Sequence, residues 1–155
     1  MAIIGSLMKT HMVTAAPDAT VAEAARSMAD NEVGAILVCE DGEIRGILSE
    51  RDVLSRVVAQ GKDPAATRVS EVATTEVVSV DVHVHVRECA TLLRDRGIRH
   101  LPVTKEGKAA GILSSRDFFS YVAEGLERLI DRARYKEKLR EGEDPYDHLG
   151  GSYGK

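Results

Sequence analysis

The chain has 155 residues and a formal net charge of −4 at pH 7, with 43% hydrophobic and 30% charged residues. This length and composition favour a compact folded protein over a disordered chain. The acidic balance argues against general nucleic-acid binding, which normally relies on an excess of lysine and arginine.

The cysteines and the apolar runs exclude further classes of protein. Cys39 and Cys89 are the only cysteines, and without a CxxC spacing they favour neither a disulfide scaffold nor a zinc site. We expect both to be buried thiols that pack as small hydrophobes. The sequence has no apolar run near the roughly 20 residues that span a membrane, and its start lacks the basic region of a signal peptide. We therefore expect a cytoplasmic protein without a membrane partner.

A strand and a helix are the first predicted elements. Residues 13–16 form an apolar, strand-like run. Thr20-Val-Ala-Glu23 then has the spacing of a capping box, which starts a helix. Apolar residues at helical spacing extend the predicted helix over 21–31.

A hairpin and a second helix follow. The strand-like runs 35–39 and 43–48 flank Asp41-Gly42, a favoured tight-turn pair. A second helix is predicted to begin after Ser49. Polar residues 60–66, with a glycine and a proline, then form a linker.

The second half of the chain repeats the first. Gly46-Ile-Leu-Ser-Glu-Arg-Asp52 recurs 65 positions later as Gly111-Ile-Leu-Ser-Ser-Arg-Asp117. The same offset aligns Val13 with Val78 and predicts the second copy's first strand over 77–80. A single copy is too small to bury a core of its own, so we expect the two to pack together. The predicted fold is α/β (α+β), with two β-α-β-β-α repeats, 1–62 and 63–123, and a C-terminal extension, 124–155.

The repeated heptapeptides, each in the same β-α-β-β-α context, resemble those of the CBS-domain family, and the pair resembles one Bateman module. The resemblance covers about residues 8–123. It implies a pseudo-two-fold pair of repeats that binds an adenosine nucleotide in clefts between them and commonly dimerises. No other cofactor is implied.

The Ser-x-x-Asp spacing of the heptapeptide has two interpretations. Ser49 with Asp52, and Ser114 with Asp117, have the spacing of a helix cap. A strand that runs into a helix N-terminus also presents backbone N–H groups to a phosphate. The resemblance assigns the phosphate to the serines and the ribose hydroxyls to the aspartates, while Arg51 and Arg116 can pair with a phosphate.

The remaining candidate site residues flank these motifs. Val13 and Val78 are expected to line an apolar slot for the base. Arg99 and His100 are expected to bring positive charge to the second site, where the first site has Gly34 and Ala35, so we expect the second site to prefer a charged nucleotide. The full set of predicted nucleotide-binding residues is Val78, Arg99, His100, Leu101, Pro102, Ser114, Ser115, Arg116, Asp117, Val13, Gly34, Ala35, Ile36, Ser49, Glu50, Arg51 and Asp52.

The remaining patterns in the sequence predict no metal site and no catalytic site. His83-Val-His85 has no cluster of cysteines or carboxylates nearby and is interpreted as a surface loop, not a metal site. No catalytic triad, Walker loop or pair of catalytic acids is present, so no enzyme activity is predicted. The C-terminal extension has an apolar helical stripe, with a break expected at Gly125. Tyr146, Leu149 and Tyr153 of its tail either fray or dock, and the sequence does not decide between the two.

Two functions stay open. The first is a regulatory module that senses AMP, ADP or ATP by rearranging its repeats, and that signals through a homodimer or to an effector protein. The second is a scaffold for oligomerisation or inhibition, in which the Ser-x-x-Asp motifs only cap helices. A different adenosyl ligand, S-adenosylmethionine or NAD, is a further alternative.

Overall fold

The computed structural model describes residues 2–142. The chain divides into two units, Met1–Asp117 and Phe118–Lys155. The tail residues Tyr146, Leu149 and Tyr153, for which the sequence left fraying and docking open, lie outside the described residues. No helix within residues 2–142 combines the length and the apolar character that crossing a membrane requires.

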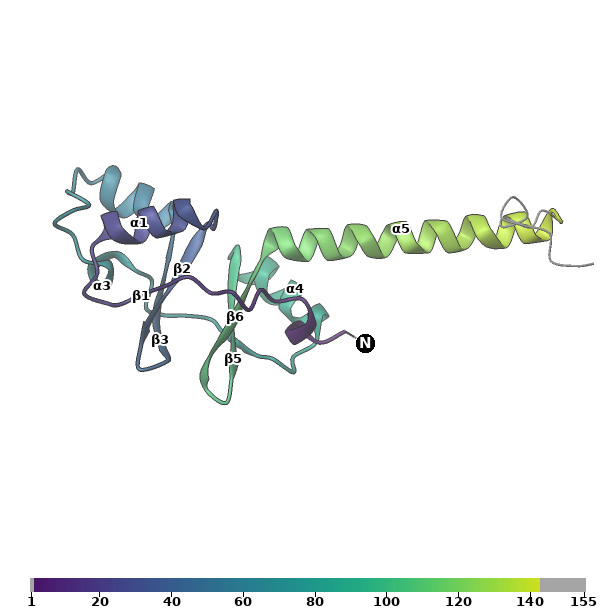
Figure 1. Cartoon of the computed structure of the whole chain (residues 1–155), viewed down its shortest axis with the longest axis horizontal. Coiled ribbons are helices and arrows are strands. Elements are labelled where there is room, and N and C mark those ends of the chain that lie inside the picture. The colour runs from purple at the N-terminus through teal and green to yellow at the C-terminus, as the bar shows by residue number, and fades with distance from the viewer. Residues whose placement is uncertain (1, 143–155) are drawn as a thin grey trace, which may run out of the picture. The chain divides into compact units, whose positions relative to one another are not determined.

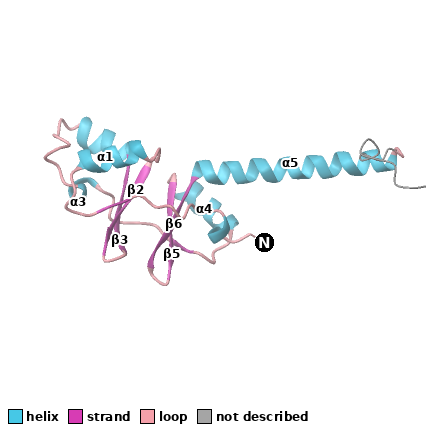
Figure 2. Cartoon of the chain, in the orientation of Figure 1, coloured by secondary structure: helices cyan, strands magenta, loops and turns pink. Residues whose placement is uncertain are grey.

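The first unit contains two three-stranded sheets of the same topology, one in each repeat (Figure 2). The first strand of each sheet is parallel to the second, and the second and third form an antiparallel hairpin. The strands of the first sheet are β1 (Thr14–Ala15), β2 (Ala35–Glu40) and β3 (Glu43–Ser49). Those of the second are β4 (Val80–Asp81), β5 (His100–Lys105) and β6 (Lys108–Ser114). The predicted fold of two β-α-β-β-α units is confirmed.

Helices connect and follow these strands (Figure 1). They are α1 (Val21–Asp30), α2 (Glu50–Val53), α3 (Val69–Val72), α4 (Val86–Arg96) and α5 (Ser115–Arg140), with a short 3-10 turn η1 (Ile4–Ser6) and a π-helical turn η2 (Leu54–Val58) that continues α2. The predicted capping box begins α1: the Glu23 N–H donates to Thr20 Oγ1 at 3.2 Å and the Thr20 N–H donates to the Glu23 carboxylate at 2.8 Å. Gly97, at φ 60°, ends α4. The start of α1 and the end of α4 are therefore both set by short sequence signals.

The structure differs from the sequence prediction at three elements. The second repeat's first strand is Val80–Asp81, later than the predicted 77–80, because its parallel ladder with β5 starts at Val80 opposite Val103. The helix α3, between the repeats, was not predicted. The break expected at Gly125 is absent, since α5 continues through it to Arg140.

The core of the first repeat lies between α1 and the sheet. Val21, Ala24 and Met28 of α1 pack against Ile36 and Val38 of β2. Strand residues alternate between the two faces of a sheet, so Ala35 and Leu37 face the other way. Cys89 is fully buried on α4, as predicted, whereas Cys39 is only partly buried because it lies near the hairpin end of β2. Burial raises the pKa of both thiols.

Each repeat is completed by the leading segment of the other. The segment 68–74 packs on the first repeat, where the Ile47 and Thr74 backbones exchange two hydrogen bonds of 2.9 Å. Residues 3–9, the same segment one repeat earlier, pack on the second repeat, where Lys9 and Ile112 pair in the same way. The two repeats therefore interlock, and the N-terminal segment is part of the core, with Ile4 fully buried.

The glycine that opens each heptapeptide makes this exchange possible. A Cβ on Gly111 would lie 2.7 Å from Met8 Sδ and 2.8 Å from the Lys9 carbonyl oxygen. A Cβ on Gly46 would lie 3.0 Å from the Thr74 carbonyl oxygen. Only a residue without a side chain lets the leading segment of the other repeat come this close.

Candidate functional site

Two cavities open between the repeats, and the repeat symmetry relates them. The larger, about 390 Å³, is lined by Lys9, residues 32–35 before and at the start of β2, and residues 114–117 at the start of α5. The smaller, about 180 Å³, is lined by Thr74, residues 97–100 and the motif residues Ser49, Arg51 and Asp52. Each set follows from the other by the 65-residue offset. Each cavity therefore combines the Ser-x-x-Asp motif of one repeat with the strand entry of the other.

Asp117 is the carboxylate of the larger cavity. The Ser114 hydroxyl and backbone N–H both donate to Asp117 Oδ2, and the Asp117 N–H donates to Ser114 Oγ at 3.2 Å. Its other oxygen, Oδ1, lies 3.2 Å from Lys9 Nζ. Partial burial favours the neutral acid, but the Ser114 hydrogen bonds and the Lys9 ion pair outweigh it, so the pKa of Asp117 is lowered. Asp117 is ionised at neutral pH and caps α5.

Positive charge lines the same cavity from three segments. Lys9 comes from the N-terminal segment, Arg99 from the residue before β5, and Arg116 from the first turn of α5. Arg99 Nη2 lies 3.5 Å from Glu50 Oε1, so this pair crosses from the second repeat to the first. The backbone N–H groups at the start of α5 add a positive dipole end. Three carboxylates, Glu32, Glu50 and Asp117, line the same cavity, so a phosphate there would be bound by the N-terminus of α5 and by cations that exchange their carboxylate partners for it.

His100 contributes differently from what the sequence suggested. The sequence analysis counted His100 with Arg99 as positive charge. Burial, and then the charge of Arg99, lower the pKa of His100 from the ordinary value of 6.5, with Glu50, Asp117 and Asp52 acting in the opposite direction. His100 is therefore neutral at pH 7, and the charge at this position comes from Arg99. The two repeats meet here, because a Cβ on Gly34 would lie 3.2 Å from His100 Nε2.

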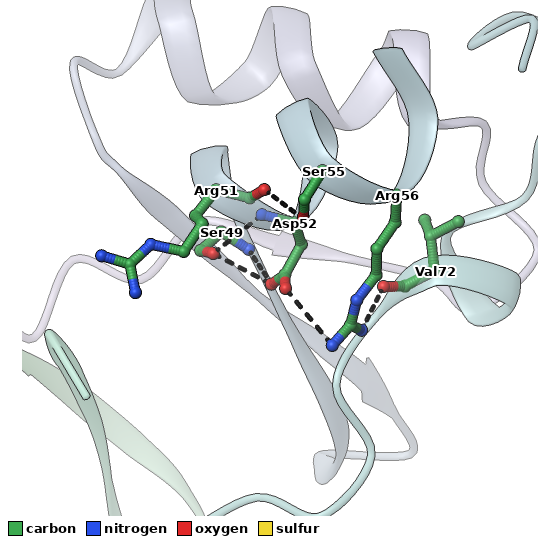
Figure 3. Close-up of polar contacts among 6 residues, drawn as sticks. All are labelled: Ser49, Arg51, Asp52, Ser55, Arg56 and Val72. Carbon is green, nitrogen blue, oxygen red and sulfur yellow. Dashed lines mark hydrogen bonds and ion pairs between the residues drawn. The ribbon is translucent and has the colours of Figure 1, made fainter. Parts of the chain in front are cut away.

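Asp52, the equivalent carboxylate of the smaller cavity, is held by its own helix (Figure 3). The Ser49 hydroxyl donates to Asp52 Oδ2 at 2.9 Å, as in the other repeat. Asp52 Oδ1 lies 3.6 Å from Arg56 Nη2, and Arg56 Nη1 donates to the Val72 carbonyl oxygen at 2.8 Å. Figure 3 shows Arg51 pointing away from Asp52. Arg56 thus engages Oδ1 of Asp52, whereas in the larger cavity Oδ1 of Asp117 is engaged by Lys9.

The structure regroups the predicted site residues. The larger cavity brings together Val13, Gly34, Ala35, Glu50, Arg99, His100 and Ser114 to Asp117. The sequence analysis had placed Gly34 and Ala35 in the other site, with Ser49 and Asp52. Arg99 and His100 line both cavities. Val78, Ile36, Leu101 and Pro102 line neither of these two cavities in the described part of the chain.

Strand alternation is the reason for Ile36 and Leu101. Ile36 packs into the core of its repeat, and Leu101, its equivalent, is fully buried. The sequence analysis also missed lining residues of the larger cavity, which are Lys9, His11, Met12, Met28, Ala29, Glu32, Val33, Leu37 and Ile112. In the smaller cavity it missed Ile47, Thr74, Gly97 and Ile98. Among these, Lys9 carries a charge that its equivalent Thr74 lacks. No sequence signal pointed to Lys9, because the 65-residue offset only aligns it with Thr74, which carries no charge.

His83 and His85 both lie exposed. His83 Nδ1 lies 2.6 Å from Asp81 Oδ1 on the surface, and His85 precedes α4 as an exposed residue. Among the residues that the structure describes, no cluster of three or more His, Cys, Asp or Glu side chains could hold a metal ion.

Comparison with known proteins decides the family. The CBS domain model matches residues 4–59 and 69–124, one match for each repeat. The chain belongs to the CBS-domain family. Both matches start in the leading segments, 3–9 and 68–74, that the two repeats exchange.

Individual relatives cover most of this tandem CBS pair. The CBS domain-containing protein YhcV of Bacillus subtilis is 37% identical over 117 residues, 76% of this chain and 83% of its own. The crystal structure of the CBS domain protein NE2398 is 31% identical and superposes with a TM-score of 0.73 over 79% of this chain and 98% of its own. A CBS domain protein from Pyrobaculum aerophilum, solved in complex with AMP, is 30% identical with a TM-score of 0.70 and covers 75% of this chain and 89% of its own.

Proposed function

We propose that the larger cavity binds one adenine nucleotide, with AMP as the reference ligand, and that this CBS pair is a regulatory module. The observation that carries the proposal is the placement of an ionised, capped Asp117 beside three cationic side chains in one cavity between the repeats. The similar protein from Pyrobaculum aerophilum, solved with AMP, supports the choice of nucleotide.

The lining residues divide between the parts of the nucleotide. The Asp117 carboxylate accepts hydrogen bonds from ribose hydroxyls. The Ser114 hydroxyl, the N-terminal N–H groups of α5, Arg99 and Arg116 face the phosphate. Lys9, whose side chain is 62% exposed, releases Asp117 to the ribose and turns to the phosphate. The base lies among the apolar residues Val13, Ala35 and Ile112.

Binding at this place couples to the arrangement of the repeats. The cavity takes its carboxylate from the second repeat and its strand entry from the first, so an occupant contacts both. A ligand that prefers one relative placement shifts the population toward it. The output then passes to an effector protein or to a second copy of the chain.

The smaller cavity favours a structural role for its own Ser-x-x-Asp motif. Arg56 engages Asp52, and Thr74 stands where the larger cavity has Lys9. This cavity has less than half the volume of the larger one. We therefore propose one nucleotide per chain, with Ser49 and Asp52 acting as a helix cap.

The repeat supplies a matched control for the test. Asp117→Ala and Asp52→Ala each remove the carboxylate half of a capping box, which accepts from the serine hydroxyl and backbone N–H, and leave the serine's own bond to the helix in place. The loss should cost each variant about 1 kcal/mol of stability. Isothermal titration with AMP should show at least a tenfold loss of affinity in Asp117→Ala and none in Asp52→Ala. Equal effects of the two variants, or no binding of AMP by the folded unmodified protein, would reject the assignment.

Parallel titrations identify the ligand class. ADP and ATP test the number of phosphates, and adenosine tests whether a phosphate is needed. S-adenosylmethionine and NAD test the alternative adenosyl ligands. If S-adenosylmethionine or NAD binds and AMP does not, and Asp117→Ala abolishes that binding, the ligand occupies the proposed cavity but AMP is the wrong ligand. If none of these compounds binds, the scaffold function stands.

A further inference from the structure

The two heptapeptides differ at a single position. Glu50 of the first stands where the second has Ser115. The Glu50 N–H donates to the Gly34 carbonyl oxygen at 3.0 Å. In the same way, the Ser115 N–H donates to the Arg99 carbonyl oxygen at 2.8 Å. The backbone is held alike in both repeats, so the difference between them at this position is the Glu50 carboxylate itself.

The Glu50 side chain belongs to the larger cavity, although its own motif lines the smaller one. Its neighbours in sequence, Ser49, Arg51 and Asp52, all line the smaller cavity. Glu50 instead lines the larger cavity, together with residues 114–117 of the other repeat. The heptapeptide of the first repeat thus places a carboxylate in the cavity whose helix N-terminus comes from the second.

Arg99 is the partner of this carboxylate. Its Nη2 lies 3.5 Å from Glu50 Oε1. By the 65-residue offset the equivalent pair is Gly34 with Ser115, which carries no charge. The side chains of Arg99 and Glu50 are 43% and 62% exposed. An ion pair this exposed contributes little to stability, so an incoming anion can take the place of one partner at small cost.

Glu50 competes with a phosphate for Arg99. The proposed function assigns Arg99 to the phosphate, but the Glu50 carboxylate already engages it. A phosphate beside this pair is attracted by the guanidinium and repelled by the carboxylate. The two effects nearly cancel, because Coulomb energy depends on distance and the two groups lie side by side. Arg99 therefore adds little net attraction as long as Glu50 stays next to it.

The charges that line the larger cavity are balanced. They come from three cations and three carboxylates, which are Lys9, Arg99 and Arg116, and Glu32, Glu50 and Asp117. The backbone N–H groups at the start of α5 compensate a first phosphate. A second or third phosphate meets no surplus of positive charge, and removal of the Glu50 carboxylate would create one.

The repulsion from Glu50 grows with the number of phosphates on the ligand. A phosphate monoester carries about −1.5 to −2 charges at pH 7, and each further phosphate makes the ligand more negative. Coulomb repulsion from a fixed carboxylate scales with that charge. For two like unit charges 4 Å apart in water it corresponds to about a fivefold loss of affinity. Glu50 therefore acts most strongly against the longest phosphate chain and leaves uncharged adenosine unaffected.

We propose that Glu50 makes the larger cavity selective for a nucleoside monophosphate. It repels the additional phosphates of a di- or triphosphate, and it engages Arg99 until the single phosphate of the monophosphate takes its place. This selectivity rests on the proposed function, since both concern the same cavity. Replacement of the carboxylate should widen the range of ligands without removing the site.

Isothermal titration with adenosine, AMP, ADP and ATP, without divalent cations, tests this role. The unmodified protein should bind AMP more tightly than ADP, and ADP more tightly than ATP. In Glu50→Gln the gain in affinity should be about fivefold larger for ATP than for AMP. The affinity for adenosine should not change, because it carries no charge.

Two further variants separate the charge of Glu50 from other effects. Glu50→Ser gives the first heptapeptide the sequence of the second and should reproduce the gain for ATP, so that the result does not depend on the glutamine amide. Glu106→Gln, in the exposed turn between β5 and β6, makes the same change in net charge outside both cavities. It should leave the ratio of the AMP and ATP affinities as in the unmodified protein.

Three results would overturn the role of Glu50 and still leave a nucleotide site that depends on Asp117. They are an equal change for AMP and ATP in Glu50→Gln, the same selectivity change in Glu106→Gln, and ATP binding by the unmodified protein as tight as its AMP binding. Titrations repeated with Mg²⁺ add a fourth, since an ATP affinity that Mg²⁺ raises and Glu50→Gln lowers would make Glu50 a metal ligand. If neither the unmodified protein nor Glu50→Gln binds any of the four compounds, the proposed function fails and the selectivity fails with it.

Discussion

Lys9 Nζ lies 3.2 Å from Asp117 Oδ1, so the first charged residue of the chain pairs with the last residue of the second heptapeptide. The equivalent carboxylate, Asp52, is paired instead with Arg56 of its own helix. The two Ser-x-x-Asp motifs have the same cap geometry and differ in what engages the second carboxylate oxygen. This contact links the N-terminal segment to the proposed nucleotide site.

Lys9→Met should weaken the binding of AMP more than the binding of adenosine. The substitution removes the cation and keeps the length of the side chain. A charge-assisted hydrogen bond is worth about 1.5–3 kcal/mol, which corresponds to at least about a tenfold loss of AMP affinity. Adenosine lacks the phosphate, so its affinity should stay constant or rise as Asp117 becomes accessible. Titration of both ligands checks this, and an equal loss for both would contradict the role given to Lys9.

Arg56→Ala should lower stability and leave AMP binding unchanged. The half-exposed Arg56 side chain donates a hydrogen bond to the Val72 carbonyl oxygen and forms an ion pair with Asp52. Loss of the hydrogen bond should cost about 1 kcal/mol in the free energy of unfolding, measured in urea. The AMP stoichiometry should remain one per chain. A second bound AMP in this variant would show that Arg56 blocks an otherwise functional site.

Gly111→Ala should destabilise the protein more than Gly46→Ala. The added methyl group on Gly111 meets both Met8 and the Lys9 carbonyl, and that carbonyl accepts the Ile112 N–H at 3.2 Å. Overpacking of this kind costs about 1–3 kcal/mol. On Gly46 the contact is longer, 3.0 Å to the Thr74 carbonyl. Urea unfolding measures the free energy of unfolding of the two variants. The reverse order of stability would mean that the segment 3–9 moves away from the added methyl group at little cost.

Acidification from pH 7.5 to 5.5 should lower stability through His100. Burial and Arg99 hold its folded-state pKa below the ordinary 6.5, so the unfolded chain takes up a proton at a higher pH than the folded protein does. Stability therefore decreases as the pH falls through 6.5, by at most about 1.4 kcal/mol per pH unit, until the folded protein is protonated as well.

His100→Gln is the control for this pH dependence. Glutamine keeps a hydrogen-bonding side chain that does not ionise. The free energy of unfolding should therefore vary less between pH 7.5 and 5.5 in this variant than in the unmodified protein. Identical pH profiles would assign the dependence to other groups.

Local sequence signals predicted the elements well. Thr20-Val-Ala-Glu23 started α1, Asp41-Gly42 made the turn of the first hairpin, and the recurrence of the heptapeptide predicted two equivalent sheets. These signals succeed because capping and tight turns depend on residues within a few positions of one another. Membership of the CBS-domain family followed from the same repeat.

Local patterns failed where long-range packing decides. The C-terminal helix did not break at Gly125, because a single glycine costs a helix only about 1 kcal/mol. The predicted nucleotide-binding residues included Ile36 and Leu101, but strand alternation turns Ile36 into the core and leaves Leu101 fully buried.

The sequence by itself determined the duplication, the β-α-β-β-α order within each repeat and the Ser-x-x-Asp motifs of the candidate site. Only the tertiary structure decided which residues share a cavity. The exchange of residues 3–9 and 68–74 brings Lys9 to Asp117, and the packing of the two repeats brings Gly34 and Ala35 to Ser114. Such pairings depend on where two distant segments cross, and no periodicity or spacing within either segment specifies that.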